Sequence, residues 1–321
     1  MTDYDVFNGD ADGICSLIQL RLAEPREAEL VTGVKRDISL LARVPAATAR
    51  RVTALDISLD KNREALQALL DAGAEVFYAD HHFAGDIPEH ASLSAHINTA
   101  PEVCTAAIVN ERLGGAHLGW AVVGAFGDNL RKTGMKLAAA AGLGDDDADK
   151  LERLGIYVNY NAYGATLQDL HFDPAELYTT LARYASPLDF ISADAATFDK
   201  LESSYRGDMQ RAAAAEVLFD AGHAQVLKLP DAAWARRVSG VYGNHLAQQH
   251  HARAHAIVTD RPAGGFQISV RAPLGNRRGA DEICRQFPTG GGRTAAAGVN
   301  ELPEEELARF IDVFEGHYRS A

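Results

Sequence analysis

Residues 4–22 read YDVFNGDADGICSLIQLRL, and this stretch decides the fold. It opens with a short strand pattern over residues 4–8, passes through the turn GDADG at residues 9–13, and continues as a helix over residues 14–22. A strand that leads directly into a helix is the first half of a β-α-β unit, in which crossover helices join parallel strands.

The same alternation continues along the chain. Residues 51–56 (RVTALD) predict a buried strand, residues 59–72 a helix and residues 75–78 the next strand. Further helices are expected over residues 106–113, 121–126 and 137–153. The pattern restarts near residue 217, with a helix over 233–252 and strands over 256–259 and 266–272. We therefore predict an α/β protein with a first domain over 1–195, a helical connector over 196–216 and a smaller α/β domain over 217–321.

Composition and charge narrow the function classes. The chain has 321 residues, of which 47% are hydrophobic and 23% charged, as is typical of a globular protein. Its net charge of −13 argues against a duplex-DNA-binding protein. No apolar run is long enough for a membrane span, the first residues lack a secretion signal, and three cysteines form no disulfide framework. A cytoplasmic location is expected.

The acidic charge is concentrated in the first part of the chain. The first 220 residues carry 19 Lys and Arg against 34 Asp and Glu, whereas residues 221–321 carry 12 against 10. Such a distribution could suit metal ions in the first part and phosphates in the second. A solvated acidic surface is the simpler interpretation of the charge alone.

Carboxylates and imidazoles follow the predicted strands and one apolar run. They are Asp10 and Asp12, then Asp56, then Asp80, His81 and His82, and finally Asp128. Ends of parallel strands meet at one edge of a sheet, and carboxylates packed together repel one another unless cations neutralise them. Each residue alone would more often be a helix cap, a turn residue or a surface histidine. Taken in this order, they favour a site for Mn²⁺ or Mg²⁺, and two such ions about 3.5–4 Å apart form a phosphoryl-transfer site.

Four segments resemble the DHH phosphoesterase superfamily: FNGDADGICS (7–16), ALDIS (54–58), YADHH (78–82) and AFGDN (125–129). Two later segments, ISVRAP (268–273) and GGGRTAAAG (290–298), resemble the DHH-associated C-terminal domain. The resemblance implies a parallel-sheet catalytic domain with flanking helices, a smaller substrate-binding domain and an active-site cleft between them. The superfamily includes RecJ-type single-strand exonucleases, nanoRNases, cyclic-dinucleotide phosphodiesterases, pyrophosphatases and exopolyphosphatases.

The resemblance also implies a role for each matching position. It assigns two Mn²⁺ ions, with Mg²⁺ as an alternative, to the ligands Asp10, Asp12, Asp56, His81 and Asp128. It places His82 on the scissile phosphate and makes Asp80 a support for the imidazoles.

The chain departs from the superfamily at the first metal. Val6 stands where many relatives carry a His, and Asn8 stands where RecJ-type members carry an Asp. Asn8 could supply a neutral oxygen to that ion, or that ion could be weakly bound.

The second domain carries a candidate phosphate site. Gly290, Gly291 and Gly292 precede Arg293 and an Ala-rich run that we predict to begin a helix, whose N-terminus would favour an anion. Arg271 is predicted at a strand end, where a guanidinium can hold a phosphate bidentately. Arg293 replaces the His of the usual GGGH. A flexible loop is the alternative for the glycines alone.

Two polar segments of the first domain are open to two interpretations. Lys35 and Arg36 could contact a phosphate, but we expect a solvated loop. The segment 159–164 (NYNAYG) could stack a base or form a turn packed by tyrosines.

We therefore expect a metal-dependent phosphoesterase that hydrolyses small nucleotides or short single-stranded oligonucleotides with water activated by two metals. It would be an oligonucleotide exonuclease or a nucleotide phosphatase, with no duplex DNA and no membrane as partner. The alternatives are an exopolyphosphatase or pyrophosphatase-like phosphoanhydride hydrolase, and a non-catalytic binding relative.

Overall fold

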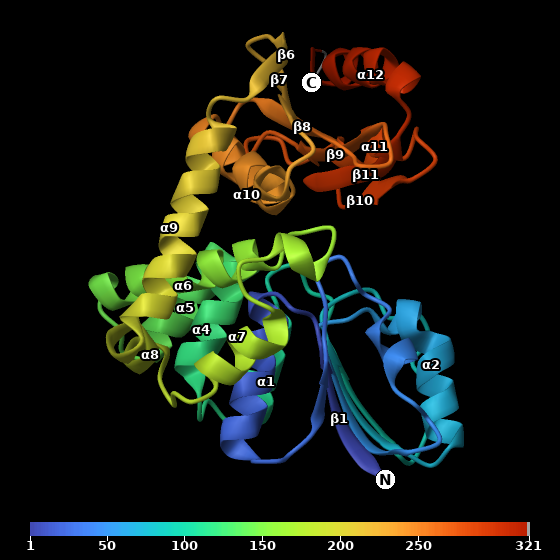
Figure 1. Ribbon diagram of the computed structural model, residues 1–321, viewed down its shortest axis with the longest axis vertical. Helices are drawn as coiled ribbons and strands as arrows, with labels where there is room; N and C mark the ends of the chain where they lie inside the picture. The colour runs from blue at the N-terminus through green and yellow to red at the C-terminus, as the bar shows by residue number, and fades with distance from the viewer. Residues whose placement is uncertain (320–321) are drawn as a thin grey trace. The chain divides into compact units, whose positions relative to one another are not determined.

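The computed structural model describes residues 1–319, which fall into two compact units (Figure 1). The first unit comprises residues 1–203 and the second begins at residue 204. Helix α9, Ala195–Ala212, runs across this boundary. Within the described residues, no helix combines the length and the apolar character that crossing a membrane requires.

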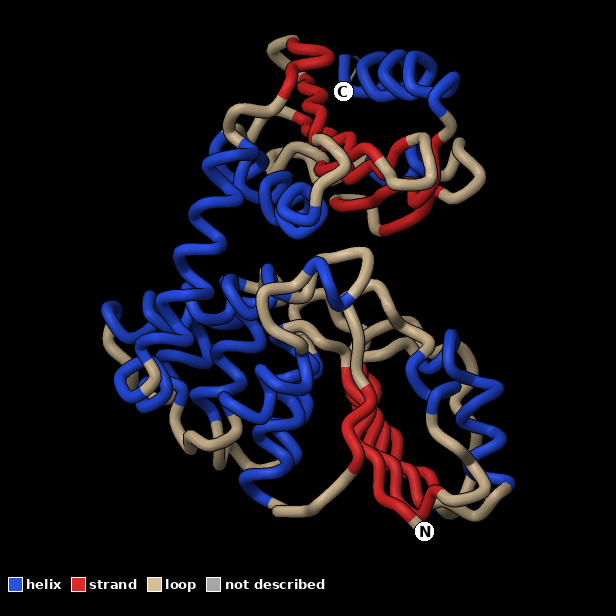
Figure 2. Tube along the Cα trace, in the orientation of Figure 1, coloured by secondary structure: helices blue, strands red, loops and turns tan. Residues whose placement is uncertain are grey.

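The first unit is built on a sheet of five parallel strands in the order β2-β1-β3-β4-β5. Figure 2 shows these strands as a single band with helices on both sides. The strands are β1 (Thr2–Phe7), β2 (Glu29–Val31), β3 (Ala49–Leu55), β4 (Glu75–Asp80) and β5 (Leu93–Ile97). The predicted parallel α/β fold is confirmed. Strands β2 and β5 were not predicted from the sequence, because they are short and have little periodic pattern.

Helices cover both faces of this sheet. Helix α2 lies on one face, and α1 lies on the other, where it packs against α3 and α4 (Figure 1). The helices are α1 (Ala11–Ala23), α2 (Leu59–Asp71), α3 (Thr105–Arg112), α4 (Leu118–Gly127), α5 (Arg131–Ala140), α6 (Asp145–Asn161), α7 (Pro174–Leu181) and α8 (Pro187–Ala193), with single 3₁₀ turns at Leu40–Arg43 and Leu167–Asp169. The α2 face buries Val6, Val52 and Tyr78 of the strands against Leu66 and Leu69 of the helix. Val6 is therefore a core residue.

The turn between β1 and α1 is fixed by its own side chains. The Asp10 carboxylate accepts hydrogen bonds from the backbone N–H groups of Asp12 and Gly13, which makes it the N-cap of α1. A Cβ at Gly13 would lie 2.2 Å from the carbonyl oxygen of Asn8, so no other residue fits there without moving the backbone. The DADG motif thus begins the helix directly at the end of the strand.

The helix predicted over residues 137–153 is wrong. The structure has two helices there, α5 and α6, separated by residues 141–144. Gly142 has φ of +70° in this break, a conformation that glycine adopts at little cost after a helix end. The high helix propensity of the Ala-rich run concealed this break.

The second unit contains a mixed sheet of six strands in the order β10-β11-β9-β8-β7-β6. Within this sheet, as far as the structure describes it, β7 and β8 are the only parallel neighbours. The strands are β6 (Glu216–Asp220), β7 (Ala224–Leu229), β8 (Ala254–Asp260), β9 (Phe266–Arg271), β10 (Gly290–Gly292) and β11 (Ala296–Leu302). The helices are α10 (Ala233–Gln249), α11 (Ala280–Cys284) and α12 (Leu307–Arg319), and a 3₁₀ turn spans Glu304–Glu306.

Candidate metal centre

Three strands of the first sheet deliver acidic or imidazole side chains to one edge. Asp10 follows β1, Asp56 follows β3 and His81 follows β4. Because these strands are parallel, their carboxyl ends lie together. Asp12 in the first turn of α1 and Asp128 at the end of α4 complete the cluster.

His81 is the centre of this cluster. Its Nε2 atom lies 3.4 Å from Asp56 Oδ1, 3.8 Å from Asp128 Oδ2 and 3.9 Å from Asp12 Oδ2. Its Nδ1 atom lies 2.9 Å from the carbonyl oxygen of Val103, so Nδ1 carries the proton and donates it there. The other ring nitrogen, Nε2, faces the three carboxylates, as expected for a metal-binding histidine.

Backbone and hydroxyl donors hold the two buried carboxylates in place. Both oxygens of Asp12 accept 2.7 Å hydrogen bonds from the N–H groups of Thr105 and Ala106 at the start of α3. The Thr105 hydroxyl donates to Asp56 Oδ1 at 3.0 Å. Asp56 itself has φ of +58°, so the chain makes a left-handed turn where it leaves β3. Thr105 was not predicted as a site residue from the sequence, because its contact with Asp56 depends on the packing of α3 against the site.

Electrostatics separate these carboxylates into two groups. Burial, with added repulsion from Asp128 and Asp10, raises the pKa of Asp12 to about 6, even though His81 acts to lower it. Burial and neighbouring carboxylates raise the pKa of Asp56 well above its usual value. Burial would also raise the pKa of Asp10, but the ammonium group of Lys35 lowers it. Among the described residues, no Lys or Arg pairs with Asp12 or Asp56, whereas Asp10 pairs with Lys35.

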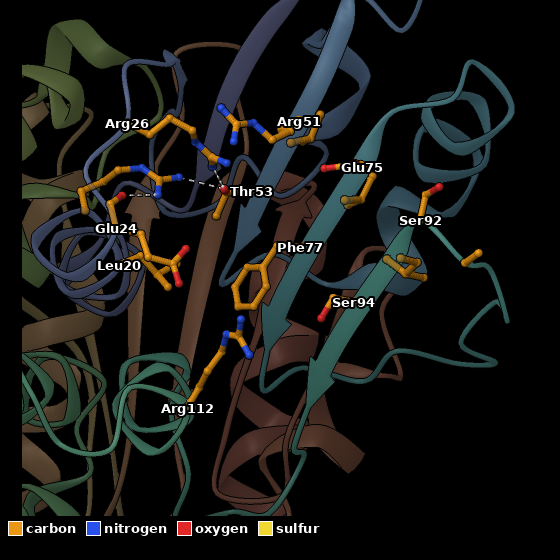
Figure 3. A pocket seen from close by; sticks show the side chains of 15 residues that line it. Leu20, Glu24, Arg26, Arg51, Thr53, Glu75, Phe77, Ser92, Ser94 and Arg112 are labelled. Atoms are coloured by element: carbon orange, nitrogen blue, oxygen red, sulfur yellow. Dashed lines mark hydrogen bonds between the residues drawn. The ribbon is translucent and has the colours of Figure 1, made fainter.

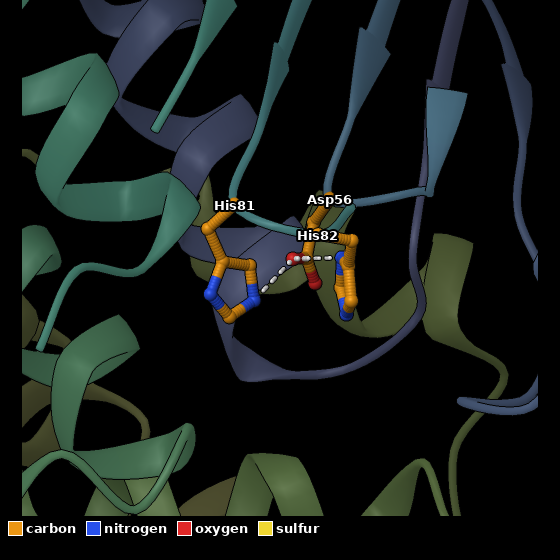
Figure 4. Close-up of side chains that lie close together, drawn as sticks. All are labelled: Asp56, His81 and His82. Carbon is orange, nitrogen blue, oxygen red and sulfur yellow. Dashed lines mark ion pairs between the residues drawn. The ribbon is translucent and has the colours of Figure 1, made fainter. Parts of the chain in front are cut away.

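His82 differs from its neighbour in position and in hydrogen bonding. Its Nδ1 atom lies 2.7 Å from Asp80 Oδ1 and 4.0 Å from Asp56 Oδ1. Figure 4 shows the imidazoles of His81 and His82 on either side of the Asp56 carboxylate. The His82 side chain is 36% exposed, compared with 5% for His81. An Nδ1 atom that donates to Asp80 is not a metal ligand at the same time, so this arrangement suits a contact with substrate.

The cluster offers two overlapping donor sets for divalent ions, and the two sets share His81. Ligand-type atoms of Asp12, His81 and Asp128 lie within 4.8 Å of one another, and so do those of Asp56, His81 and His82. Three carboxylates and one imidazole are the oxygen-rich, mixed ligands that Mn²⁺ and Mg²⁺ accept. An ion at this place would also supply the positive charge that Asp12 and Asp56 lack.

The expectation of a solvated loop is wrong for Lys35. Its ammonium group contacts Asp10 Oδ2 and lies 2.9 Å from Asn159 Oδ1. The sequence contained one weak signal of this position, the pair Leu30 and Val31 a few residues before Lys35, but two apolar residues were too few to predict a strand. Asn8, the candidate neutral ligand, accepts a hydrogen bond from the Asp10 N–H and donates to the carbonyl of Lys35.

The candidate phosphate residues all lie in the second unit. Arg271 is the last residue of β9, and its guanidinium donates to Asn244 and to the carbonyls of Gly240 and Val270. The helix predicted after Arg293 is wrong. The glycines form β10, and Ala296–Leu302 forms β11, which pairs with both β10 and β9.

The turn between β10 and β11 places Arg293 at the surface. Arg293 and Ala296 exchange backbone hydrogen bonds there, and the Arg293 side chain is exposed. Pairing of this small-residue run with β9 overrode its helix propensity. A glycine-rich hairpin remains, without a helix N-terminus to favour an anion.

A cavity of about 370 Å³ lies elsewhere in the first unit (Figure 3). It is near the amino ends of β3 and β4, away from the strand ends that carry the carboxylates. Its lining includes Arg21, Arg26, Arg51 and Phe77. Asp5 pairs with Arg21 and Arg26, and Asp3 pairs with Arg51. This cavity contains none of the residues that the sequence analysis singled out.

The chain is similar to known proteins in its structure. No protein-family model and no curated protein matches the chain. The structure of exonuclease RecJ bound to manganese is similar to the whole chain, with a TM-score of 0.63 and 19% identity, and the match covers 91% of RecJ. The pGpG-specific phosphodiesterase PggH from Vibrio cholerae matches all of this chain and 99% of its own, with a TM-score of 0.60 and 16% identity.

An exopolyphosphatase-related protein from Bacteroides fragilis matches 99% of this chain and 91% of its own, with a TM-score of 0.51 and 14% identity. These likenesses show the fold. The expected resemblance to the DHH superfamily is confirmed at that level, over both units of the chain.

Proposed function

We propose that this protein is a metal-dependent phosphoesterase that hydrolyses phosphoester bonds of small nucleotides or short oligonucleotides. The observation that carries the proposal is the position of His81 Nε2, which faces Asp12, Asp56 and Asp128 from within 4 Å. Buried carboxylates around an imidazole whose other nitrogen is already bonded suit a divalent ion better than any apolar ligand.

Different residues of the chain have different proposed roles in metal binding and in contact with the phosphate. Asp12, Asp56, His81 and Asp128 hold the ion, which supplies Lewis-acid polarisation of the phosphoryl group and activation of water at neutral pH. His82, more exposed and oriented by Asp80, donates a hydrogen bond to a phosphoryl oxygen as negative charge develops there. Thr105 and the first turn of α3 keep the carboxylates in the orientation that the ion needs.

The second unit is proposed to bind the rest of the substrate. The Arg271 guanidinium is held by Asn244 and by two carbonyls, which limits its freedom before substrate arrives. Arg293, on the exposed turn of a hairpin, is the proposed contact for a terminal phosphate. The net charge of −13 favours a small substrate over duplex DNA.

Relatives of the same fold support the choice of nucleotide substrates, since one is an exonuclease and another a pGpG-specific phosphodiesterase. The likeness to an exopolyphosphatase-related protein keeps phosphoanhydride hydrolysis as the second candidate.

The test is a screen of purified protein with Mn²⁺ against short single-stranded RNA, linear and cyclic dinucleotides, bisphosphorylated adenosine and polyphosphate. The Asp56→Ala variant is the control, because a contaminating hydrolase would survive it. Release of mononucleotides by the wild type alone supports the proposal. Activity on polyphosphate alone would favour the second candidate, and no activity on any substrate would favour a binding relative.

A further inference from the structure

A cation of the protein itself lies at one side of the candidate metal centre. The Lys35 ammonium contacts Asp10 Oδ2 and lies 2.9 Å from Asn159 Oδ1 and 3.9 Å from Asp128 Oδ1. It also lies 5.5 Å from the centroid of the Tyr163 ring, over the face of that ring. Two carboxylates, an amide oxygen and an aromatic face thus surround one ammonium group.

The fold brings Lys35 to this place by strand pairing. β2 pairs in parallel with β1, so the loop after β2 emerges at the same edge as Asp10. This loop passes so close to the end of β1 that a Cβ at Gly9 would lie 2.1 Å from the carbonyl oxygen of Gly33. The Lys35 N–H donates to the carbonyl of Ala162 at 2.9 Å, and the Asn8 side chain donates to the carbonyl of Lys35 at 3.2 Å. The backbone of Lys35 is therefore held from both sides.

Both carboxylate oxygens of Asp10 already have partners while Lys35 is in place. Its Oδ1 accepts the N–H groups of Asp12 and Gly13, and its Oδ2 contacts the ammonium. Nor can Val6 supply a ligand, because it is an apolar side chain fully buried on the α2 face of the sheet. Asn8 is engaged with the Asp10 N–H and with Lys35. The ligands needed for an ion beside Asp10 are thus missing or occupied.

The other side of the cluster is different. Asp12, Asp56 and Asp128 face His81 Nε2, and no Lys or Arg is paired with Asp12 or Asp56 among the described residues. One divalent ion would neutralise the carboxylates that face His81, whereas Lys35 already pairs with Asp10. The cluster then has two cations, which are one metal ion beside His81 and the ammonium group of Lys35 beside Asp10.

We infer that Lys35 takes the place of the first of two metal ions, so that this protein binds a single divalent ion, held by Asp12, Asp56, His81 and Asp128. This inference rests on the proposed function, since it takes the cluster to be a metal centre. It departs from the two-ion site that the sequence resemblance implies, and the departure lies in this chain's own residues.

The experiment counts metal ions. Wild type, Lys35→Ala and the control Lys61→Ala are loaded with excess Mn²⁺ and dialysed, and bound manganese is measured by elemental analysis. Lys61 is an exposed lysine beside Asp60, so its removal controls for the loss of one positive charge. We expect one ion per chain in the wild type and the control. We expect two in Lys35→Ala, because the shortened side chain frees Asp10 Oδ2 and opens space for an ion.

Electron paramagnetic resonance of the same samples gives an independent readout. One Mn²⁺ per chain gives the six-line spectrum of an isolated ion, whereas two ions about 3.5–4 Å apart are magnetically coupled and give a broadened spectrum. The wild-type spectrum tests the predicted count of one ion even if Lys35→Ala does not fold.

The other possible results separate failure of the Lys35 inference from failure of the proposed function. Two tightly held ions in the wild type would overturn the replacement of an ion by Lys35 and leave the proposed phosphoesterase standing. One ion in both wild type and Lys35→Ala would show that Lys35 does not keep the second ion out, and would overturn the inference in the same way. No bound manganese in folded wild type would overturn the proposed function, and the inference with it.

Discussion

Thr105→Val tests whether the hydrogen bond from the Thr105 hydroxyl to Asp56 strengthens metal binding. The substitution removes a hydroxyl donor with almost no change in volume. The lost hydrogen bond, from Thr105 Oγ1 to Asp56 Oδ1, is 3.0 Å long and buried. The backbone N–H of Thr105 still donates to Asp12 at 2.7 Å, so the start of α3 keeps its contact with the site.

The size of the effect follows from the kind of bond that is lost. A hydrogen bond to a charged group contributes about 1.5–3 kcal/mol. If that energy orients Asp56 toward the ion, its loss weakens Mn²⁺ binding roughly tenfold to a hundredfold, the range that is common for partners of metal ligands. We expect the dissociation constant for Mn²⁺ to rise by that factor.

The assay is isothermal titration calorimetry with Mn²⁺, with circular dichroism as the check on folding. Thr133→Val is the matched control, because its hydroxyl donates to the carbonyl of Glu102 at the protein surface. The reasoning is refuted if folded Thr105→Val binds Mn²⁺ within threefold of the wild type. A lower melting temperature with unchanged Mn²⁺ affinity would assign Thr105 a purely structural role.

Three further predictions concern the ligands, the pH dependence and the substrate. His81→Ala should lose bound manganese, while His82→Ala should keep it and lose at least a hundredfold in kcat; equal metal loss in both, by elemental analysis, would contradict this division. Because the pKa of Asp12 is raised to about 6, protons compete with the metal below that pH, and Mn²⁺ affinity should fall roughly tenfold between pH 7 and pH 5, with most of the fall below pH 6. Titrations at the three pH values check this, and equal affinities would count against Asp12 as a ligand. Arg293→Ala should lower kcat/KM roughly tenfold for a dinucleotide with a 5′-phosphate and little for one without it; an unchanged ratio between the two substrates would remove Arg293 from the phosphate site.

The convergence of the acidic residues was predictable from sequence, because parallel strands share an edge for their carboxyl ends. Asp10 and Asp56 follow strands whose apolar pattern is clear, so their shared edge follows from the fold class alone. The same holds for His81 after β4. No contact between distant residues had to be known in advance.

The position of Lys35 could not be predicted in this way. It depends on β2, a strand of three residues that is defined by its pairing with β1 and not by any pattern of its own. The hairpin of β10 and β11 escaped prediction for a related reason. Its Gly- and Ala-rich residues favour no strand locally, and the pairing with β9 decides their structure.

Asp10 performs two tasks that no other residue can combine. Asn or Ser at position 10 would still cap α1, but would leave the Lys35 ammonium without its carboxylate, and Ala would also lose the cap at a cost of about 0.5–2 kcal/mol. A mutational scan would therefore score position 10 as intolerant even with a selection that reports only on folded protein. Sensitivity at this position is no measure of catalysis. The two positions should also show epistasis: once Lys35 is replaced by a neutral residue, Asn becomes acceptable at position 10, and tolerance at one site is set by the residue at the other.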